Sequence, residues 1–352
     1  MQHLLYLIDS LSLGGAETIV VNTLNYIKKT HIDIEISIIT TVSANGYLSD
    51  KLYESVNYQH IDCRNFNFYK GVLSIRKYTA EKNVTLIHSH LFHSIIVGRL
   101  VKKRDIKLFE TFHNLEYNKD AVYFSWWRVQ LDRLTYKKES FSIYVSDDVK
   151  QSIEKIRKHN TRFMVLNNFA GEEFQFNYQP TSNNDLKLIA VGNLKRDKNF
   201  IYALETFANL KSCSVSLDIY GEGPLRDELE DFIKLNNIKV RLMGRHQMNS
   251  DILTTYDAFL MTSLNEGMPI SLLEAMNVGL PCILPDHLNV MKEVAQNGAL
   301  YFTLKDKTAL STIINNLIEN KLILINLSNS IFERSRLYAI DTHIARLMEL
   351  YT

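Results

Sequence analysis

The sequence predicts an α/β protein with two doubly wound domains, each a parallel β-sheet with helices on both faces. Three observations support this prediction. The chain has 352 residues, which is more than one hydrophobic core usually supports. Short apolar runs alternate with helical patterns along both halves, as in parallel sheets. A polar stretch with Pro180 separates the halves, so we expect domains at 1–168 and 187–330 and a linker at 169–186.

The composition is ordinary for a globular protein, with 46% hydrophobic and 22% charged residues and a net charge of +1. This near-neutral charge does not favour a nucleic-acid partner. The three cysteines, Cys63, Cys213 and Cys282, lack a metal-ligand spacing, which predicts reduced thiols. The apolar run Leu4–Ile8 is too short for a signal peptide or a membrane span. We therefore expect a cytoplasmic protein.

In the first half, the pattern opens with a strand at 4–8, a glycine-containing loop at 9–15 and a helix at 16–28. Gly14 and Gly15 stand at this turn, where glycine lets a ligand approach the backbone; a purely structural turn is the alternative. A helix is also expected at 146–158. Further strands are expected at 32–40, 84–88, 107–112, 142–145 and 165–166.

In the second half, the same alternation restarts at Leu188. Several strands end in glycine-led loops, and the loop after Gly192 also carries Lys195, Arg196 and Lys198. Cations in a loop at a strand end suit a phosphate. Strands are expected at 188–191, 215–220, 240–243, 258–261 and 282–284, and helices at 199–210, 225–236 and 270–278.

The most informative stretch runs from residue 262 to residue 276. It follows a strand, passes through a polar loop with Gly267, and reaches Pro269 where a helix is expected to start. Proline is tolerated at the first helical position because its missing N–H would be unpaired there. A helix N-terminus carries unpaired N–H groups and a partial positive charge, so this one suits a phosphate.

Two carboxylates flank this helix N-terminus. Glu266 lies in the loop, and Glu274 lies about one turn inside the helix, on the face of Ile270 and Ser271. Carboxylates repel phosphate, so their expected task is to accept hydrogen bonds from hydroxyl groups such as a vicinal diol. In the alternative interpretation Glu266 is a solvated loop residue and Glu274 is a first-turn charge favoured by the helix dipole.

Histidines collect where strands of the first half end: His88, His90 and His93 after one strand and His113 after the next. Ligands of open α/β sheets bind at the carboxyl ends of strands, so His113 is a candidate site residue, although a lone histidine is more often structural. The His88-x-His90 pair does not predict zinc, because no third ligand stands at a usual spacing.

The charge is unevenly distributed. Residues 1–168 hold 23 Lys and Arg against 17 Asp and Glu, and the remainder holds 17 against 22. The basic excess clusters at 99–104 and at 126–138, where Trp126 and Trp127 interleave with basic residues. These stretches are either solvated helix faces or a surface for anionic lipid headgroups.

With these motifs in order, nearly the whole chain resembles the retaining glycosyltransferases of family 4, which have the GT-B fold of two Rossmann-like domains facing a cleft. The resemblance predicts a retaining hexosyltransferase that takes a UDP-sugar as its expected donor. It also implies that the final helix, 331–352, packs back on the first domain. The motifs that carry the resemblance are Gly14-Gly-Ala-Glu17, His113, Val191-Gly192 with Lys198-Asn199, Tyr220-Gly-Glu-Gly-Pro224, and Glu266 with Glu274 in an E-x7-E spacing.

The resemblance implies a role for each matching position. Glu274 would bind the ribose of the donor, and Glu266 would hold the sugar hydroxyls with the amides of Gly267 and Met268. Lys198 would neutralise the diphosphate, aided by N–H groups near Ile270 and Ser271. Gly14 and Gly15 would abut the phosphate from the other domain, where His113 would contact the sugar. Gly221 and Arg245 complete the implied donor-binding set, with the base expected near Arg245.

Two positions depart from the family pattern. Asn193 stands where the family often has arginine, so Arg196 is the candidate replacement for that charge. Pro269 stands where glycine is frequent, which removes one amide donor. No D-x-D occurs, so the diphosphate is expected to be bound by protein cations, without a metal or another cofactor.

The acceptor expected from the basic, aromatic first domain is a glycan or lipid-linked glycan at the inner membrane face, as in capsule or O-antigen synthesis. Two other classes remain open. One is a nucleotide-sugar epimerase or hydrolase of the same fold. The other is a non-catalytic nucleotide-binding protein or a dehydrogenase, although no complete G-x-G-x-x-G fingerprint is present.

Overall fold

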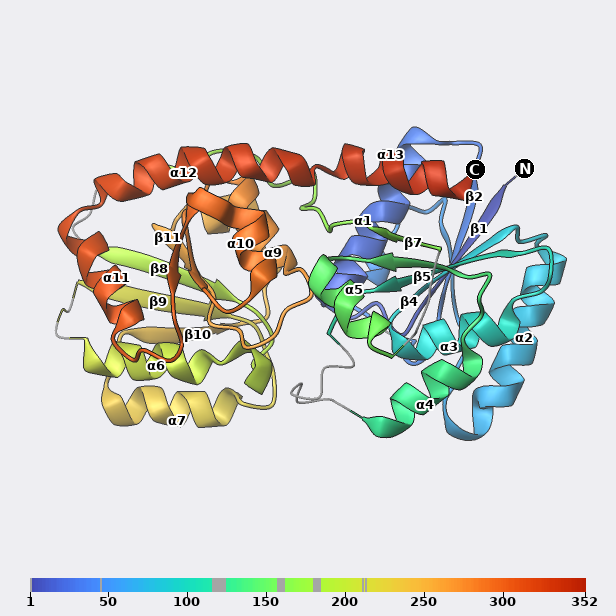
Figure 1. The fold of residues 1–352 in the computed structure, drawn as a ribbon, viewed down its shortest axis with the longest axis horizontal. Coiled ribbons are helices and arrows are strands. Elements are labelled where there is room, and N and C mark those ends of the chain that lie inside the picture. The colour runs from blue at the N-terminus through green and yellow to red at the C-terminus, as the bar shows by residue number, and fades with distance from the viewer. Residues whose placement is uncertain are drawn as a thin grey trace. The chain divides into compact units, whose positions relative to one another are not determined.

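The computed structural model describes residues 2–44, 46–115, 125–156, 162–179, 185–210, 212 and 214–352. The chain forms two compact units: unit 1 holds residues 1–168 and 341–352, and unit 2 holds residues 169–340 (Figure 1). Of the expected linker, residues 180–184, which include Pro180, lie outside the described part. Its preceding residues belong to unit 2, where Tyr178 donates a hydrogen bond to the Asp257 carbonyl at 3.0 Å. Cys213 also lies outside the described residues.

Unit 1 contains a parallel sheet whose described strands lie in the order β3-β2-β1-β4-β5-β6-β7. The expected strands are all present, and β3 is an addition that the sequence did not predict. β1 is buried along its whole length, since helices cover both faces of the sheet. The strands are β1 His3–Ile8, β2 Glu35–Thr40, β3 Asn57–His60, β4 Leu86–His90, β5 Lys107–Phe112, β6 Phe141–Tyr144 and β7 Phe163–Val165.

In unit 1 a helix follows β1, β3, β4, β5 and β6 and leads to the next strand, whereas β2 and β3 are joined through a short 3-10 turn. On one face, Leu5 and Leu7 of β1 pack in a cluster with Val72, Ile75 and Val97 from α2 and α3. The expected helix at 146–158 is α5, which ends at residue 154; Lys158 lies outside the described residues. The helices are α1 Gly15–Thr30, α2 Phe68–Glu81, α3 Phe92–Val101, α4 Trp126–Thr135, α5 Asp147–Glu154 and α13 Ile340–Tyr351.

The C-terminal helix α13 is fixed to the opposite face of this sheet by its last tyrosine. The Tyr351 hydroxyl lies 2.5 Å from the Tyr6 hydroxyl and 2.5 Å from Nδ1 of His88. The single helix expected over 331–352 is instead two helices, because a 3-10 turn at Arg336–Tyr338 separates α12 from α13. Only the residues from 341 onward belong to unit 1.

A buried ion-pair cluster joins three elements of unit 1. The Arg99 guanidinium of α3 donates two hydrogen bonds to Glu110 of β5, at 2.6 and 2.8 Å. It also lies 2.9 Å from Oδ1 of Asp132 on α4 and donates to the carbonyl of that residue. All three side chains are almost fully removed from solvent. The cluster therefore fixes α4 to the sheet.

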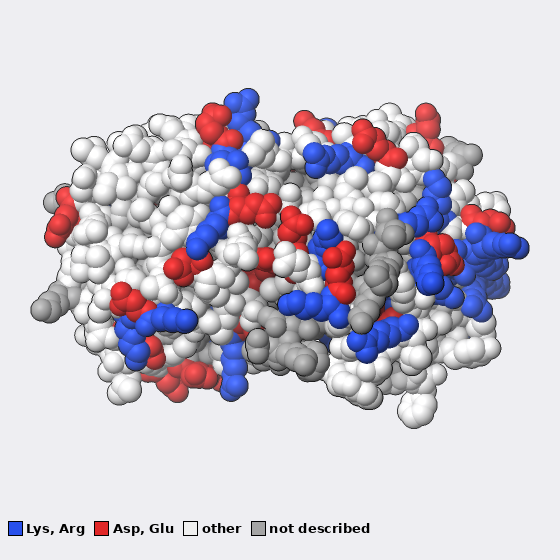
Figure 2. Space-filling view, viewed as in Figure 1, with Lys and Arg blue, Asp and Glu red and all other residues white. Residues whose placement is uncertain are grey.

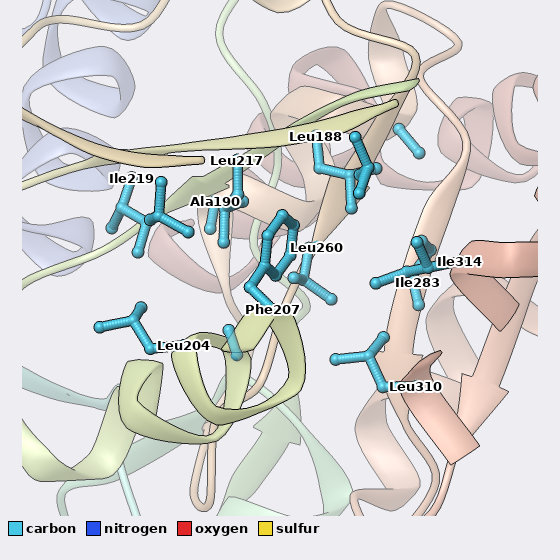
Figure 3. Packing of buried hydrophobic residues seen from close by; sticks show 14 of the residues in the cluster. Leu188, Ala190, Leu204, Phe207, Leu217, Ile219, Leu260, Ile283, Leu310 and Ile314 are labelled. Atoms are coloured by element: carbon cyan, nitrogen blue, oxygen red, sulfur yellow. The ribbon is translucent and has the colours of Figure 1, made fainter. Parts of the chain in front are cut away.

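Unit 2 contains a second parallel sheet, with described strands in the order β10-β9-β8-β11-β12-β13. Figure 3 shows its apolar cluster, in which Leu204 and Phe207 of α6 face Leu188, Leu217 and other strand residues. The strands are β8 Leu186–Val191, β9 Val215–Tyr220, β10 Val240–Gly244, β11 Ala258–Leu260, β12 Cys282–Pro285 and β13 Ala299–Phe302. The helices are α6 Phe200–Asn209, α7 Arg226–Asn236, α8 Ser250–Leu253, α9 Ile270–Asn277, α10 Asn289–Ala295, α11 Ala309–Glu319 and α12 Leu322–Ser335.

The two sheets confirm the predicted fold class: two Rossmann-like domains with parallel strands and covering helices. Within the described parts of both units, every helix is too short or too polar to cross a bilayer.

Candidate functional site

The candidate site of unit 2 begins in the loop after β8. Lys198 ends a short 3-10 turn, Arg196–Lys198, and its side chain extends back across Gly192. A Cβ atom at Gly192 would lie 3.0 Å from Cε of Lys198, so glycine gives the lysine room at this point. Asn193 and Arg196, the two positions weighed for an arginine, are both exposed.

The structure brings Lys198 against Glu266, which is 68 residues away in sequence. Nζ of Lys198 lies 2.5 Å from Oε1 of Glu266, and the two side chains keep only 22% and 12% of their exposure. The same loops are joined by two further hydrogen bonds, from the Thr262 hydroxyl to the Lys198 carbonyl and from the Leu264 amide to the Asp197 carbonyl. These hydrogen bonds fix the loop of Lys198 to the loop of Glu266, so the two charged side chains are kept close together.

The pair lies beside the N-terminus of α9, which begins at Ile270. This start agrees with the predicted helix at 270–278, and Pro269 directly precedes the first helical residue instead of occupying that position. The loop residues Gly267 and Met268 are buried, and Ser271 is partly exposed in the first turn. The first N–H groups of a helix have no carbonyl partner within the helix. A lysine and a helix N-terminus thus present positive charge at the same loop.

Glu274 lies one turn further into α9 and is partly buried. Loss of hydration raises its pKa to about 8, and the negative charge of Glu173 adds to this effect. The Glu274 carboxyl group is therefore protonated to a greater extent near neutral pH than an exposed glutamate. It can both donate and accept a hydrogen bond, whereas the sequence analysis treated it as an acceptor only.

Three glycine-led loops of unit 2 start side by side. The Gly192 amide donates to the Tyr220 carbonyl, and the Gly221 amide donates to the Gly244 carbonyl, at 2.9 and 2.8 Å. Gly221 has φ +148° and lies so close to the Gly192 carbonyl that a Cβ atom would meet its oxygen. This glycine is therefore required by the packing of the loops themselves. Arg245 follows as an exposed side chain.

In unit 1 the glycine pair stands where the sequence predicted it, at the start of α1. Gly14 is extended and precedes the helix, and Gly15 is its first residue. A Cβ atom at Gly14 would lie 2.5 Å from Oε2 of Glu17. The glycine thus makes room for a carboxylate in the first turn. An incoming phosphate would meet the charge of Glu17 there, a feature that the sequence analysis missed.

His113 follows β5 and is buried, with 7% of its surface exposed. Its Nε2 atom lies 3.0 Å from Nδ1 of His90. Both residues line an interior cavity of about 20 Å³ together with His88 and His343. Nδ1 of His113 and Nε2 of His90 have no hydrogen-bond partner among the described residues. Each neutral ring carries one N–H, and one of the two rings uses it in the shared hydrogen bond. The outer nitrogen of that ring is therefore unprotonated, and the outer nitrogen of the other ring is protonated. A single water molecule can donate a hydrogen bond to the first of these atoms and accept one from the second.

His88 is held by hydrogen bonds on both sides of its ring. Its two ring nitrogens lie 2.5 Å from the Tyr351 hydroxyl and 2.7 Å from the Thr111 hydroxyl. Among the residues that the structure describes, no group of three or more His, Cys, Asp or Glu side chains is arranged to hold a metal ion.

We expect the histidine cluster to make unit 1 sensitive to acid. Burial lowers the pKa of His113 to about 3 and that of His343 to about 4, and it lowers those of His88 and His90 well below the ordinary value. The unfolded chain therefore binds protons below about pH 6.5 that the folded chain does not, so stability is full above that pH and falls below it. Each histidine lowers the free energy of unfolding by at most about 2 kcal/mol between pH 6.5 and pH 5.

Urea unfolding curves at about pH 7.5 and pH 5 would measure this loss. His343→Gln is expected to make the pH dependence shallower, while the same change at the exposed His31 leaves it unaltered. An equal slope for wild type and His343→Gln would contradict the assignment.

Comparison with known proteins places both halves of the chain in one class. Residues 13–170 match the family model for Glycosyltransferase Family 4, and residues 172–337 match the model for glycosyl transferases group 1. The capsular polysaccharide biosynthesis glycosyltransferase CapH of Staphylococcus aureus is 24% identical over 349 residues, 94% of both chains. The putative glycosyltransferase EpsF of Bacillus subtilis is 36% identical over 95 residues, which cover 26% of this chain and 25% of the relative.

Solved structures resemble the whole chain in fold. Anabaena HepE in complex with UDP-glucose has a TM-score of 0.85 at 15% identity, covering 100% of this chain and 99% of that chain. The lipopolysaccharide outer core galactosyltransferase WaaB in its apo form has a TM-score of 0.73 at 17% identity, covering 98% of both.

Proposed function

The chain belongs to the glycosyltransferases of GT-B fold, and on that premise we propose that it is a retaining hexosyltransferase that uses a UDP-sugar as donor. The observation that carries the proposal is the Lys198–Glu266 pair beside the N-terminus of α9. Positive charge and carboxylate hydrogen-bond acceptors there suit the two parts of a nucleotide diphosphate sugar. UDP as the nucleotide is supported by the HepE complexes with UDP, UDP and glucose, and UDP-glucose.

The donor would occupy the loops of unit 2 as follows. Lys198 and the first amides of α9, near Ile270 and Ser271, would bind the diphosphate, and Glu274 would bind the ribose diol. A phosphate near Lys198 would weaken its ion pair with Glu266, which frees the carboxylate for the sugar hydroxyls. Gly267 and Met268 would add backbone contacts. The base would lie near Arg245 and Gly221.

The chemistry proposed is attack of an acceptor hydroxyl on the same face of the sugar as the departing diphosphate. The glycosidic oxygen bond forms as the bond to the diphosphate breaks, and the hydroxyl proton passes to a leaving-group oxygen. Negative charge grows on the diphosphate during this step. Lys198 and the α9 N-terminus would stabilise that charge, which is the main catalytic effect expected of this site. No metal or other cofactor is included.

We also propose that the acceptor is a glycan carried on a lipid, and that unit 1 binds it in the synthesis of a surface polysaccharide such as capsule or O-antigen. One relative, 24% identical over 305 residues, is named as an Escherichia coli galactosyltransferase acting on GlcNAc-diphosphoundecaprenol. His113, Gly14 and Gly15 of unit 1 would approach the donor sugar and its phosphates. In this proposal the enzyme works in the cytoplasm at the inner face of the membrane.

A thermal-shift panel of UDP, GDP and ADP with their common sugar conjugates tests the donor site. A nucleotide at about 100 times its Kd should stabilise the protein by about 2.7 kcal/mol. We expect this for UDP and its conjugates and expect Glu274→Ala to abolish it. Glu205→Ala, at an exposed position on α6, is the matched control and should keep the shift. Absence of any shift with the wild type would remove the donor assignment.

The rival enzyme class, an epimerase or hydrolase, needs no acceptor. Incubation with donor alone separates the classes, because a transferase should release free UDP slowly without acceptor. Fast acceptor-independent turnover would favour the rival. A non-catalytic protein would bind UDP and show no turnover under either condition, and Glu266→Ala would then change nothing but affinity.

A further inference from the structure

The helices α2, α3 and α4 form one layer of unit 1 (Figure 1). The segments that contain α2 and α4 expose large apolar side chains. We call this surface the aromatic face. Both tryptophans of the protein belong to it. Exposed apolar residues that cluster, unlike single ones, mark surfaces that bind a partner. The aromatic face consists of Phe66 before α2, Tyr69 and Leu73 on α2, and Trp126, Trp127 and Leu134 on α4.

Ring contacts at the N-terminal ends of the helices join α2 to α3 and α3 to α4. The Phe68 ring of α2 meets His93 of α3 edge-on, with centroids 6.0 Å apart. Phe92 of α3 meets Trp127 of α4 in the same way at 5.9 Å. Arg128 stacks over the Phe92 ring. These contacts hold the three helices together, and one of them includes Trp127 of the aromatic face.

The segments that contain α2 and α4 are also basic. Residues 125–138 contain four Lys or Arg residues, and their single acid, Asp132, is buried in the pair with Arg99. Residues 65–80 contain three Lys or Arg residues and no acid. Glu81 and Glu139 border these segments, paired with Lys77 and Lys102. Figure 2 shows Lys and Arg side chains gathered at the end of unit 1 that carries α2.

On α4 the apolar and basic residues share one stripe. Trp126 and Arg133 lie at helical spacing on the exposed side of α4, while Val129 and Asp132 face the protein, and the exposed Lys137 follows the end of the helix. Amphipathic helices with aromatic and basic residues lie in the boundary between lipid headgroups and acyl chains. Tryptophan and tyrosine favour this boundary, and lysine and arginine bind anionic headgroups.

We propose that the aromatic face docks unit 1 onto a bilayer of anionic lipids. The proposal rests on the proposed function in one respect: the acceptor is carried on a lipid. The helices α2, α3 and α4 begin at the carboxyl ends of the strands that precede them, which is where ligands of such sheets bind. Docking there would bring the headgroup of a lipid-linked acceptor to the edge of the sheet that carries His113.

Flotation with vesicles tests the proposal without any sugar substrate, so its result is independent of the donor site. Vesicles of about 30% phosphatidylglycerol in phosphatidylcholine should bind the wild-type protein, and pure phosphatidylcholine should bind it at least tenfold more weakly. Raising salt from about 0.05 to 0.5 M should release most of the protein.

Two variants of unit 1 test whether the aromatic face is the part that binds the vesicles. Arg133→Glu with Lys137→Glu should weaken vesicle binding at least about 30-fold, since two cations are lost and two anions gained. Trp126→Ala should weaken it at least about threefold, because an exposed indole is removed from the interface. The matched charge control is Lys305→Glu with Lys307→Glu in unit 2, two exposed lysines that should change nothing.

Leucines provide a second matched pair. Leu134 of α4 is 83% exposed and Leu235 of α7 is 85% exposed. Alanine at Leu134 should weaken binding, and alanine at Leu235 should not. No binding of the wild type to anionic vesicles at low salt would overturn the proposal, as would binding that none of the unit 1 variants weakens. A dimer in solution that buries Trp126 would also overturn it, because the face would then be a protein interface.

Discussion

Lys198→Ala is expected to lower kcat for sugar transfer by about 100- to 1,000-fold. The lysine is the cation held beside the N-terminus of α9, and the leaving diphosphate gains charge only as the glycosidic bond breaks. Its loss therefore raises the barrier more than it weakens donor binding, so KM for the donor should change less than kcat. Steady-state kinetics with varied donor and saturating acceptor would measure both constants.

Three controls make this result interpretable. Lys292→Ala removes an exposed lysine of α10 and should leave kcat unchanged. Lys198→Arg retains the charge and should recover part of the rate. Lys198→Ala leaves Glu266 without its cation, so a melting temperature measured for each variant must show that folding is intact. A kcat above about one tenth of wild type in Lys198→Ala would contradict the catalytic role, since one lost donor to a developing charge costs more than that.

The sequence was sufficient to predict the sheets because both are parallel and buried on both faces. Strands such as β1 and β12 are uninterrupted apolar runs, and each is followed by a helix. The sequence missed β3 and β13, which lie at edges of their sheets, and the β3 sequence Asn-Tyr-Gln-His is polar, as suits an edge strand. The break between α12 and α13 was missed because residues 331–351 contain neither glycine nor proline.

The candidate site was predictable only in its local parts. The loop before α9 and its two glutamates follow from consecutive residues, so their positions could be read directly. The ion pair of Glu266 with Lys198 depends on β8 lying beside β11, an adjacency created by a crossover that spans β9 and β10. Likewise, neighbouring strands β4 and β5 predict that His90 and His113 are near each other. Their shared hydrogen bond depends on ring orientations that no sequence pattern specifies.

Arg99→Met is expected to destabilise unit 1 by about 3–5 kcal/mol, which is the largest stability effect among our predictions. The substitution leaves Glu110 and Asp132 buried without their shared cation. It also removes the hydrogen bonds that Arg99 donates to the Asp132 carbonyl and the Thr135 hydroxyl at the end of α4. Urea unfolding followed by a unit 1 tryptophan would measure the change. Arg64→Met, which breaks an exposed ion pair with Asp62, is the matched control and should not shift the midpoint.

A triple variant can show whether the stability lost in Arg99→Met comes from the unpaired carboxylates or from lost packing around the guanidinium. Burying two charges is costly even when they are paired, so the triple variant Arg99→Met, Glu110→Leu, Asp132→Leu should recover most of the stability. If the triple variant were as unstable as Arg99→Met, packing around the guanidinium would be the cause and not the unpaired carboxylates. The cluster also joins α4 to the sheet, so amides of α4 should exchange faster in Arg99→Met than those of α5. Because α4 carries Trp126 and Arg133, weaker vesicle binding by Arg99→Met would connect this buried cluster to the aromatic face.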